Sequence, residues 1–115
     1  GLIETFDDVQ ETLEVNSVLQ LKGLFALMVN GDSMIESFIA DGDMVLMEPV
    51  NDPSRLRNGT IVSAMVPGLG TTLKHFFRDG SLVRLEAANT SYEPIEIDAE
   101  QVHVQGKLAA VWRKT

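Results

Sequence analysis

A series of short apolar segments, each of strand length, constrains the fold of this chain more than any other feature of its sequence. Turn signals built around Gly42, Gly59, Gly68 and Gly80 separate them. Amphipathic stretches of about 10–15 residues, which the helices of an α/β fold would require, are not found. We therefore predict a mainly β fold, a compact and mostly antiparallel domain. The expected strands are Leu24–Val29, Met44–Val50, Ile61–Val66, Thr71–Phe77, Ser81–Glu86, Pro94–Ile97 and Lys107–Trp112.

Three local patterns refine this prediction. Asp79-Gly80 lies between two apolar segments, which is typical of a two-residue hairpin turn with both residues at positive φ. Ser33–Ile39 is the one short helix we expect, and Thr12–Val15 alternates as a short strand would. Residues 1–22 are otherwise acidic and weakly patterned, so we divide a single domain, 1–115, into an N-terminal arm, 1–22, and a core, 23–115.

Length and composition limit what this domain can do. At 115 residues, with 44% hydrophobic and 23% charged residues, it is one globular domain. Its formal net charge of −8 repels phosphate backbones, so we expect another segment of the parent protein to bind any nucleic acid. Cysteine is absent, which excludes disulfides and thiolate metal sites and fits a reducing compartment. No apolar run approaches the roughly 20 residues that span a bilayer, and no secretory signal is expected.

Ser33 follows a glycine turn at the junction of a predicted strand and the predicted helix. With Glu36 three residues later it forms a capping-box pattern, and most such serines only cap a helix. The same position beside free backbone N–H groups could instead stabilise the oxyanion of an acyl-transfer intermediate. A nucleophilic serine also needs a base to take its proton.

Lys74 is the lysine that lies in the middle of an apolar strand segment. Alternation places it on one face with Thr72 and Phe76, whereas His75 points to the other face. A general base must be the neutral amine, which burial against apolar groups favours because desolvation penalises the ammonium. The alternatives are that Lys74 protects an edge strand from pairing, or that His75 or His103 is the base.

Several segments of the chain resemble the LexA-type repressors and their relatives. In chain order they are Gly31–Met34, Ile39–Leu46, Asn58–Val62, Thr71–Phe76, Leu85–Ile95 and Val104–Arg113. These segments contain the serine and lysine motifs and cover most of Leu24–Arg113. On this resemblance the chain is identified as a member of the LexA/UmuD/phage repressor family of self-cleaving Ser/Lys peptidases.

The resemblance implies a β-clip type fold in which Ser33 and Lys74 meet across 41 positions of sequence. Ser33 would be the nucleophile, Lys74 the general base, and the backbone N–H groups of Asp32 and Ser33 the oxyanion hole. The enzyme would cut its own Ala–Gly bond just upstream, which makes Gly1 the new N-terminus, with no metal or cofactor. It further implies a homodimer formed by this domain and its last strand, in the bacterial cytoplasm. Stimulation by the RecA–ssDNA filament after DNA damage, and DNA binding by an N-terminal winged helix-turn-helix outside these residues, are also implied.

Some alternatives remain open at this stage. Gly1 could be a residue added in cloning, because the chain does not begin with Met. The domain could be a processed polymerase accessory subunit of the UmuD type, a phage repressor domain, or an inactive dimerisation domain. His75 stands where relatives often carry Arg, and Thr60 where they often carry an acid. A metal site of Asp32, Asp41 and Asp43 is not expected, because their spacing fits no calcium loop.

Overall fold

The computed structural model describes residues 8–11 and 23–113. Within them, eight strands form one antiparallel sheet in the order β1-β2-β3-β8-β4-β5-β6-β7. The strands are β1 Val9–Glu11, β2 Phe25–Val29, β3 Met44–Pro49, β4 Thr60–Val66, β5 Gly70–Asp79, β6 Leu82–Glu86, β7 Ile95–Asp98 and β8 His103–Trp112, with 3-10 turns η1 Ile35–Ser37 and η2 Pro53–Arg55. The prediction of a mainly β, antiparallel domain is confirmed.

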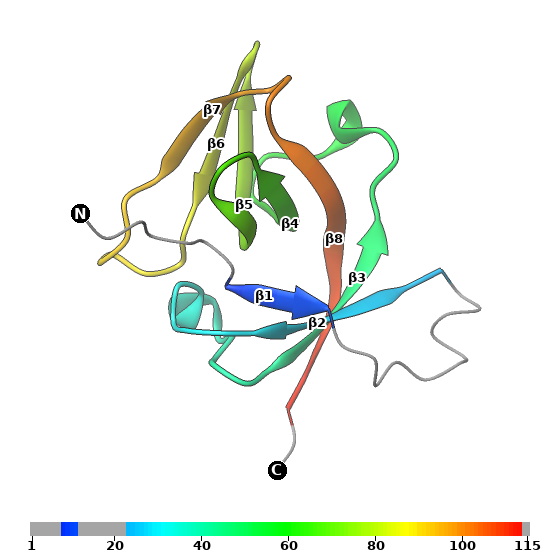
Figure 1. Cartoon of the computed structure of the whole chain (residues 1–115), viewed down its shortest axis with the longest axis vertical. Helices are drawn as coiled ribbons and strands as arrows, with labels where there is room; N and C mark the ends of the chain where they lie inside the picture. Colours follow the sequence, from blue (N-terminus) through cyan, green and yellow to red (C-terminus); the bar gives the residue numbers. More distant parts are fainter. Residues whose placement is uncertain (1–7, 12–22, 114–115) are drawn as a thin grey trace.

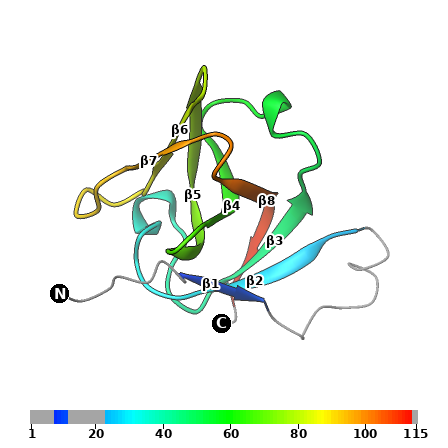
Figure 2. The ribbon, with the colours of Figure 1, turned by 45° about the horizontal axis from the view of Figure 1, so that its top comes forward.

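β8 joins the two halves of the sheet (Figure 1). Its first part pairs with β4 through residues 103–107, and its second part pairs with β3 through residues 106–112. The register shifts at Leu46/Met47 and at Ser63/Ala64, and such irregularities bend a strand. The sheet therefore curls, with β1–β3 in one half and β4–β7 in the other (Figure 2).

Gly106 lies where β8 passes from one partner strand to the other. A Cβ atom there would lie 2.7 Å from the Phe25 ring and 3.0 Å from the carbonyl oxygen of Glu48. Because the Phe25 ring packs directly against this backbone, position 106 requires a residue without a side chain.

Each half of the sheet encloses its own apolar core. The cluster beneath β1–β3 includes Val29, Met34 and Ile39, and Leu73 of β5 joins it. The second cluster, in the β4–β7 half, contains Val62, Phe76 and Leu85 among others. β5 contributes to both cores, and this position places its central residues at the junction of the two halves.

The structure corrects the predicted helix. Of the predicted helix Ser33–Ile39, only Ile35–Ser37 is helical, as a 3-10 turn. Phe38 ends this turn in the left-handed conformation, with φ of 63°. Met34 and Ile39 on either side are both 1% exposed. Because both ends are anchored in the core, the intervening residues have room for a single tight turn.

The predicted turn at Asp79-Gly80 is displaced by one residue. Asp79 pairs with Leu82, so Gly80 and Ser81 form the two-residue connection. Gly80 alone of these residues has positive φ, at 60°, as the first central position of a type II′ turn requires. The candidate strand Thr12–Val15 lies outside the described residues.

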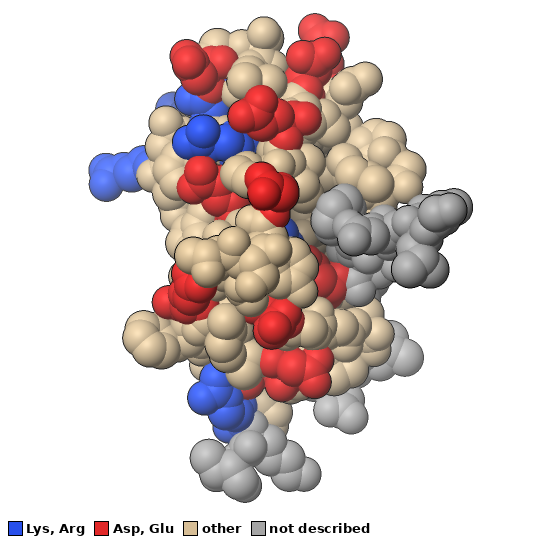
Figure 3. Space-filling view, turned by 90° about the vertical axis from the view of Figure 1, so that its left-hand side faces the viewer, with Lys and Arg blue, Asp and Glu red and all other residues tan. Residues whose placement is uncertain are grey.

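Acidic side chains are spread over the face shown in Figure 3, and the basic side chains there lie in a few small groups. This distribution agrees with the net charge of −8. In the part of the chain that the structure describes, no helix is long and apolar enough to cross a membrane.

Candidate active site

The turn that carries Ser33 connects β2 to η1. Gly31 adopts φ of 92°, a conformation that favours glycine, and its N–H donates to Asp41 Oδ1 at 2.7 Å. Asp41 itself follows Ala40, which lies after the helical turn. The loop is therefore closed on itself, and it holds Ser33 in a site where the residue is 7% exposed.

Ser33 does not cap the helical turn. The N-cap of η1 is Met34, and no side chain forms a capping hydrogen bond there. Glu36, the expected partner in a capping box, accepts instead from the N–H of Thr90 at 3.0 Å. The Ser33 hydroxyl is therefore available for contacts with other elements.

Lys74 lies in the middle of β5, which is paired on both sides by β4 and β6. The interpretation as an edge-strand lysine is therefore wrong. Lys74 is 2% exposed, and its neighbours on the same face, Thr72 and Phe76, are also buried. The predicted alternation is confirmed, because His75 is only partly buried and faces the other way.

The structure brings Ser33 and Lys74 together. Lys74 Nζ lies 3.1 Å from Ser33 Oγ, within hydrogen-bond reach of a nucleophile and a base. The ammonium also donates to Thr72 Oγ1 at 2.6 Å and to the carbonyl oxygen of Leu73 at 3.2 Å. These two contacts come from the same strand as Lys74, so the strand itself aims the amine at the serine turn.

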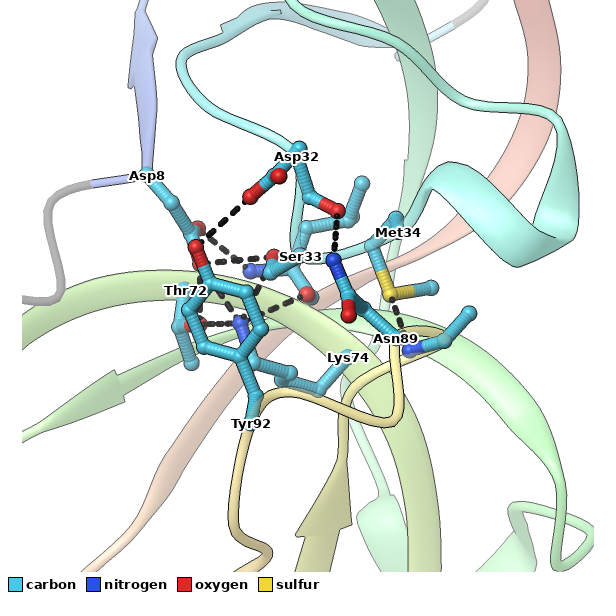
Figure 4. Close-up of polar contacts among 10 residues, drawn as sticks. Asp8, Asp32, Ser33, Met34, Thr72, Lys74, Asn89 and Tyr92 are labelled. Atoms are coloured by element: carbon cyan, nitrogen blue, oxygen red, sulfur yellow. Dashed lines mark hydrogen bonds and ion pairs between the residues drawn. The ribbon is translucent and has the colours of Figure 1, made fainter.

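A carboxylate that the sequence analysis did not single out completes the cluster (Figure 4). Asp8, the residue before β1, lies with Oδ2 2.5 Å from Lys74 Nζ. The same oxygen accepts from Thr72 Oγ1 at 2.7 Å and, over a longer 3.4 Å, from Ser33 Oγ. Asp8 Oδ1 accepts the N–H of Leu73 at 2.9 Å.

Sequence reasoning missed Asp8 because nothing local marks it. It lies in an acidic, weakly patterned stretch with several other carboxylates. It reaches the site because β1 pairs with β2, and its own carbonyl accepts the N–H of Asn30 at 2.7 Å. This strand pairing, which no sequence motif encodes, brings the Asp8 carboxylate into contact with Lys74.

The loop between β6 and β7 also contacts the serine turn, through Asn89 and Tyr92 (Figure 4). Asn89 Nδ2 donates to the carbonyl oxygen of Asp32 at 2.9 Å, and Tyr92 Oη donates to Asp32 Oδ1 at 2.7 Å. The Glu36 N–H donates to the carbonyl oxygen of Ala88 at 2.7 Å. The loop thus fixes the peptide that joins Asp32 to Ser33.

The backbone amides predicted as oxyanion donors are those of Asp32 and Ser33. Among the described residues, neither N–H has a hydrogen-bond partner. Asn89 holds the carbonyl side of the Asp32–Ser33 peptide, so the Ser33 N–H points away from that contact. Free, fixed amides beside a nucleophile are the arrangement that an oxyanion hole requires.

The chain matches the model of a known protein family. Residues 2–109 match the model described as "Peptidase S24-like". The chain belongs to this peptidase family. The match includes the serine turn, the strand that carries Lys74 and the residue Asp8.

Curated proteins similar to this Peptidase S24-like domain include several named "LexA repressor". The protein of Koribacter versatilis is 41% identical over 104 residues, which cover 90% of this chain and 48% of that protein. The protein of Erythrobacter litoralis is 43% identical over 112 residues, covering 97% of this chain and 47% of the relative. The protein of Novosphingobium aromaticivorans is 46% identical over 90 residues, which cover 78% of this chain and 37% of that protein. The chain thus spans about half the length, or less, of these relatives.

The histidines of this Peptidase S24-like domain lie away from Ser33. His75 Nδ1 lies 2.8 Å from the carbonyl oxygen of Gly59, which can only accept a hydrogen bond, so Nδ1 is the donor and carries the hydrogen. His75 Nε2 then faces the hydroxyl of Ser37 at 3.0 Å. His103 is exposed at the start of β8. Neither is positioned as the base for Ser33.

The exposed Lys107 and the buried Asp43 make contacts with residues other than Ser33. Lys107 is exposed and lies 3.9 Å from Glu48, while Lys22 and Lys114 lie outside the described residues. Asp43, which is 1% exposed, is held by Arg113. In the described part of the chain, no group of three or more His, Asp and Glu side chains is arranged to hold a metal ion.

Proposed function

We propose that this domain is the self-cleaving Ser/Lys peptidase domain of a LexA-type transcriptional repressor. Ser33 is the nucleophile, Lys74 is the general base, and the N–H groups of Asp32 and Ser33 form the oxyanion hole. The bond that is cut precedes Gly1. The observation that carries the proposal is the buried contact of 3.1 Å between Lys74 Nζ and Ser33 Oγ in a Peptidase S24-like domain.

The mechanism follows from these positions. The neutral amine of Lys74 takes the proton from Ser33 Oγ, which attacks the carbonyl carbon of the residue before Gly1. The two backbone amides stabilise the oxyanion, and Lys74 then gives its proton to the departing amine of Gly1. Water attacks the resulting ester and gives a proton to Lys74, which returns it to Ser33 Oγ as the acyl segment is released. Since nucleophile and substrate share one chain, attack is unimolecular.

The repressor function requires parts of the molecule beyond this domain. We infer that DNA is bound by a separate N-terminal domain, because the acidic surface of this one repels phosphate. Dimerisation is assigned to this domain and its last strand. The end of β8 supports this, since Val111 and Trp112 are 41% and 54% exposed and offer apolar surface to a second copy. Stimulation of cleavage by the RecA–ssDNA filament in the bacterial cytoplasm completes the proposal.

The full-length parent protein provides the direct test. Incubated at alkaline pH, it is expected to cut itself and to yield a fragment whose N-terminal residue is Gly1. The rate should rise with pH, because a lysine accepts a proton only as the free amine. Mass spectrometry of the fragment and a rate profile between about pH 6 and 10 are the measurements. A rate that does not change over this range would argue against Lys74 as the base, and a different new N-terminus would reassign the bond.

Asn89 is expected to act as a positioning residue for this reaction. Asn89→Ala removes the donor that fixes the Asp32 carbonyl, and we expect self-cleavage to slow about tenfold, because small displacements of catalytic groups are costly. Asn58→Ala is the matched control, since this exposed amide makes a similar 2.9 Å contact with the Arg78 N–H, far from Ser33. Both variants should lose similar stability in urea. Equal cleavage rates in the two variants would contradict a positioning role.

A further inference from the structure

The polarity of the hydrogen bonds around Ser33 and Lys74 is opposite to what attack requires. A general base must accept the serine proton through a free lone pair. In the structure, Lys74 Nζ is surrounded by oxygens of Asp8, Thr72, Leu73 and Ser33 at 2.5–3.2 Å. The Asp8 carboxylate and the Leu73 carbonyl can only accept, so the nitrogen acts as a donor toward them.

The hydroxyl groups follow the same polarity. Thr72 Oγ1 donates its hydrogen to Asp8 Oδ2 at 2.7 Å and accepts from Lys74. Ser33 Oγ has Asp8 Oδ2 as its acceptor at 3.4 Å, and it accepts from Lys74 at 3.1 Å. The serine proton is thus directed to the carboxylate and not to the amine. This network is a satisfied resting arrangement, built around one buried cation and one carboxylate.

Asp8 also occupies the space that a substrate needs. Its carboxylate lies against the Ser33 hydroxyl, while Gly1 is seven positions earlier in the chain. For attack, the carbonyl carbon of the residue before Gly1 has to come to Ser33 Oγ, beside which the Asp8 carboxylate now lies. The Asp8 side chain is 17% exposed, and while β1 stays paired its carboxylate is held by Thr72, the Leu73 N–H and Lys74.

The strand that follows Asp8 is short and lies at the edge of the sheet. β1 has three residues, it pairs with β2 alone at one end of the sheet, and Val9 is its buried anchor. A short terminal strand of this kind can open locally without unfolding of the rest of the domain.

From these observations, and resting on the function proposed above, we propose that Asp8 is an inhibitory residue of this peptidase. Its carboxylate holds Lys74 as a hydrogen-bond donor and covers Ser33. Detachment of β1 from β2 removes the carboxylate, frees the amine and opens the serine to the scissile carbonyl. Anything that displaces β1 therefore activates cleavage without a change in the dyad itself.

The test uses the full-length protein with Asp8→Asn, which keeps an oxygen for the Leu73 N–H and removes the charge. Two rates are measured: self-cleavage, and labelling of Ser33 by a fluorophosphonate, which needs no scissile bond. We expect both to rise about tenfold, because hydrogen bonds to charged groups are worth about one power of ten or more. Asp98→Asn, an exposed carboxylate on β7, is the control and should change neither rate.

A second variant fixes β1 in place without touching the site. Gln10 pairs with Met28 across β1 and β2, and residues 1–115 contain no cysteine, so Gln10→Cys with Met28→Cys can form one cross-strand disulfide within this domain. Oxidised protein should be labelled and cut several-fold more slowly than reduced protein. Rapid cleavage of the cross-linked form would overturn the proposal.

The outcomes separate this proposal from the proposed function. If the wild-type protein cuts itself and Asp8→Asn is equally fast or slower, Asp8 is not inhibitory, while the Ser/Lys reaction stands. If no form of the protein is labelled at Ser33 or cut, the proposed function fails and the role of Asp8 fails with it. Faster labelling and faster cleavage of Asp8→Asn together support both.

Discussion

Replacement of Lys74 by methionine is expected to slow self-cleavage of the full-length protein by about 10³-fold or more, because the proposed reaction would lose its general base. Ser33→Ala should be equally inactive, because the attacking oxygen is gone. Residues that act as a unit are not additive, so the double variant should be no slower than either single one. The measurement is the loss of intact protein over time at alkaline pH.

The stability of these variants provides the internal check. Lys74→Met leaves Asp8 without its cation at 2.5 Å, and removal of one partner of a buried ion pair costs about 3–5 kcal/mol. Adding Asp8→Asn should recover part of this stability but none of the cleavage. Lys107→Met, which removes an exposed lysine, should affect neither property. If Lys74→Met is cut as fast as the wild type, another group is the base and the assignment of the dyad is wrong.

The second large effect is a loss of stability on substitution of Asp43, whose carboxylate links Arg113, after β8, to Ala40 in the loop that follows η1. Its Oδ1 accepts from Arg113 Nε at 2.7 Å, and its Oδ2 accepts from Arg113 Nη2 and from the Ala40 N–H, both at 2.8 Å. Asp43→Ala removes three hydrogen bonds to a buried carboxylate. We expect a loss of about 3 kcal/mol in the free energy of unfolding, measured in urea.

This contribution should depend on pH in a defined direction. The hydrogen bond from Arg113 lowers the pKa of Asp43 below its ordinary value of 3.8, aided by the Ala40 N–H, against the opposing effect of burial. The folded state therefore prefers the carboxylate, and its stabilisation is fully present above the unfolded pKa and is lost as the pH falls through the lower, folded pKa.

The difference in stability between wild type and Asp43→Ala should consequently shrink in strong acid. Arg84→Ala is the control, because its ion pair with Glu86 is exposed and should contribute less than about 1 kcal/mol at any pH. A difference between wild type and Asp43→Ala that is constant down to about pH 2 would show that the charge of Asp43 is not what stabilises the loop.

The strands could be predicted from the sequence because each depends on its own residues. Thr72, Lys74 and Phe76 are buried on one face as expected, although Leu73 on the other face is buried too, and glycine marks several of the turns. Where tertiary packing overrides local preference, the prediction was wrong. η1 is one turn because the buried Met34 and Ile39 fix its ends, and the Gly80 turn moved by one residue because Asp79 pairs with Leu82.

The catalytic candidates were visible as residue types in suitable local settings. A serine after a glycine turn and a lysine within an apolar strand each had a simpler explanation, and the resemblance of the surrounding segments favoured the functional one. Their contact across 41 positions is a property of the sheet, since it depends on how β2 and β5 are brought together.

By itself, the sequence determined a β domain of this family and its serine and lysine motifs, because periodicity, turn residues and motifs are local. The tertiary structure alone decided that Asp8 lies on Lys74, 66 positions away, and that Asn89 holds the peptide before Ser33. Such contacts follow from strand pairing and loop packing. A carboxylate or an amide in a loop has no local signal that distinguishes it from its solvated neighbours, because its role depends on which distant groups surround it after folding.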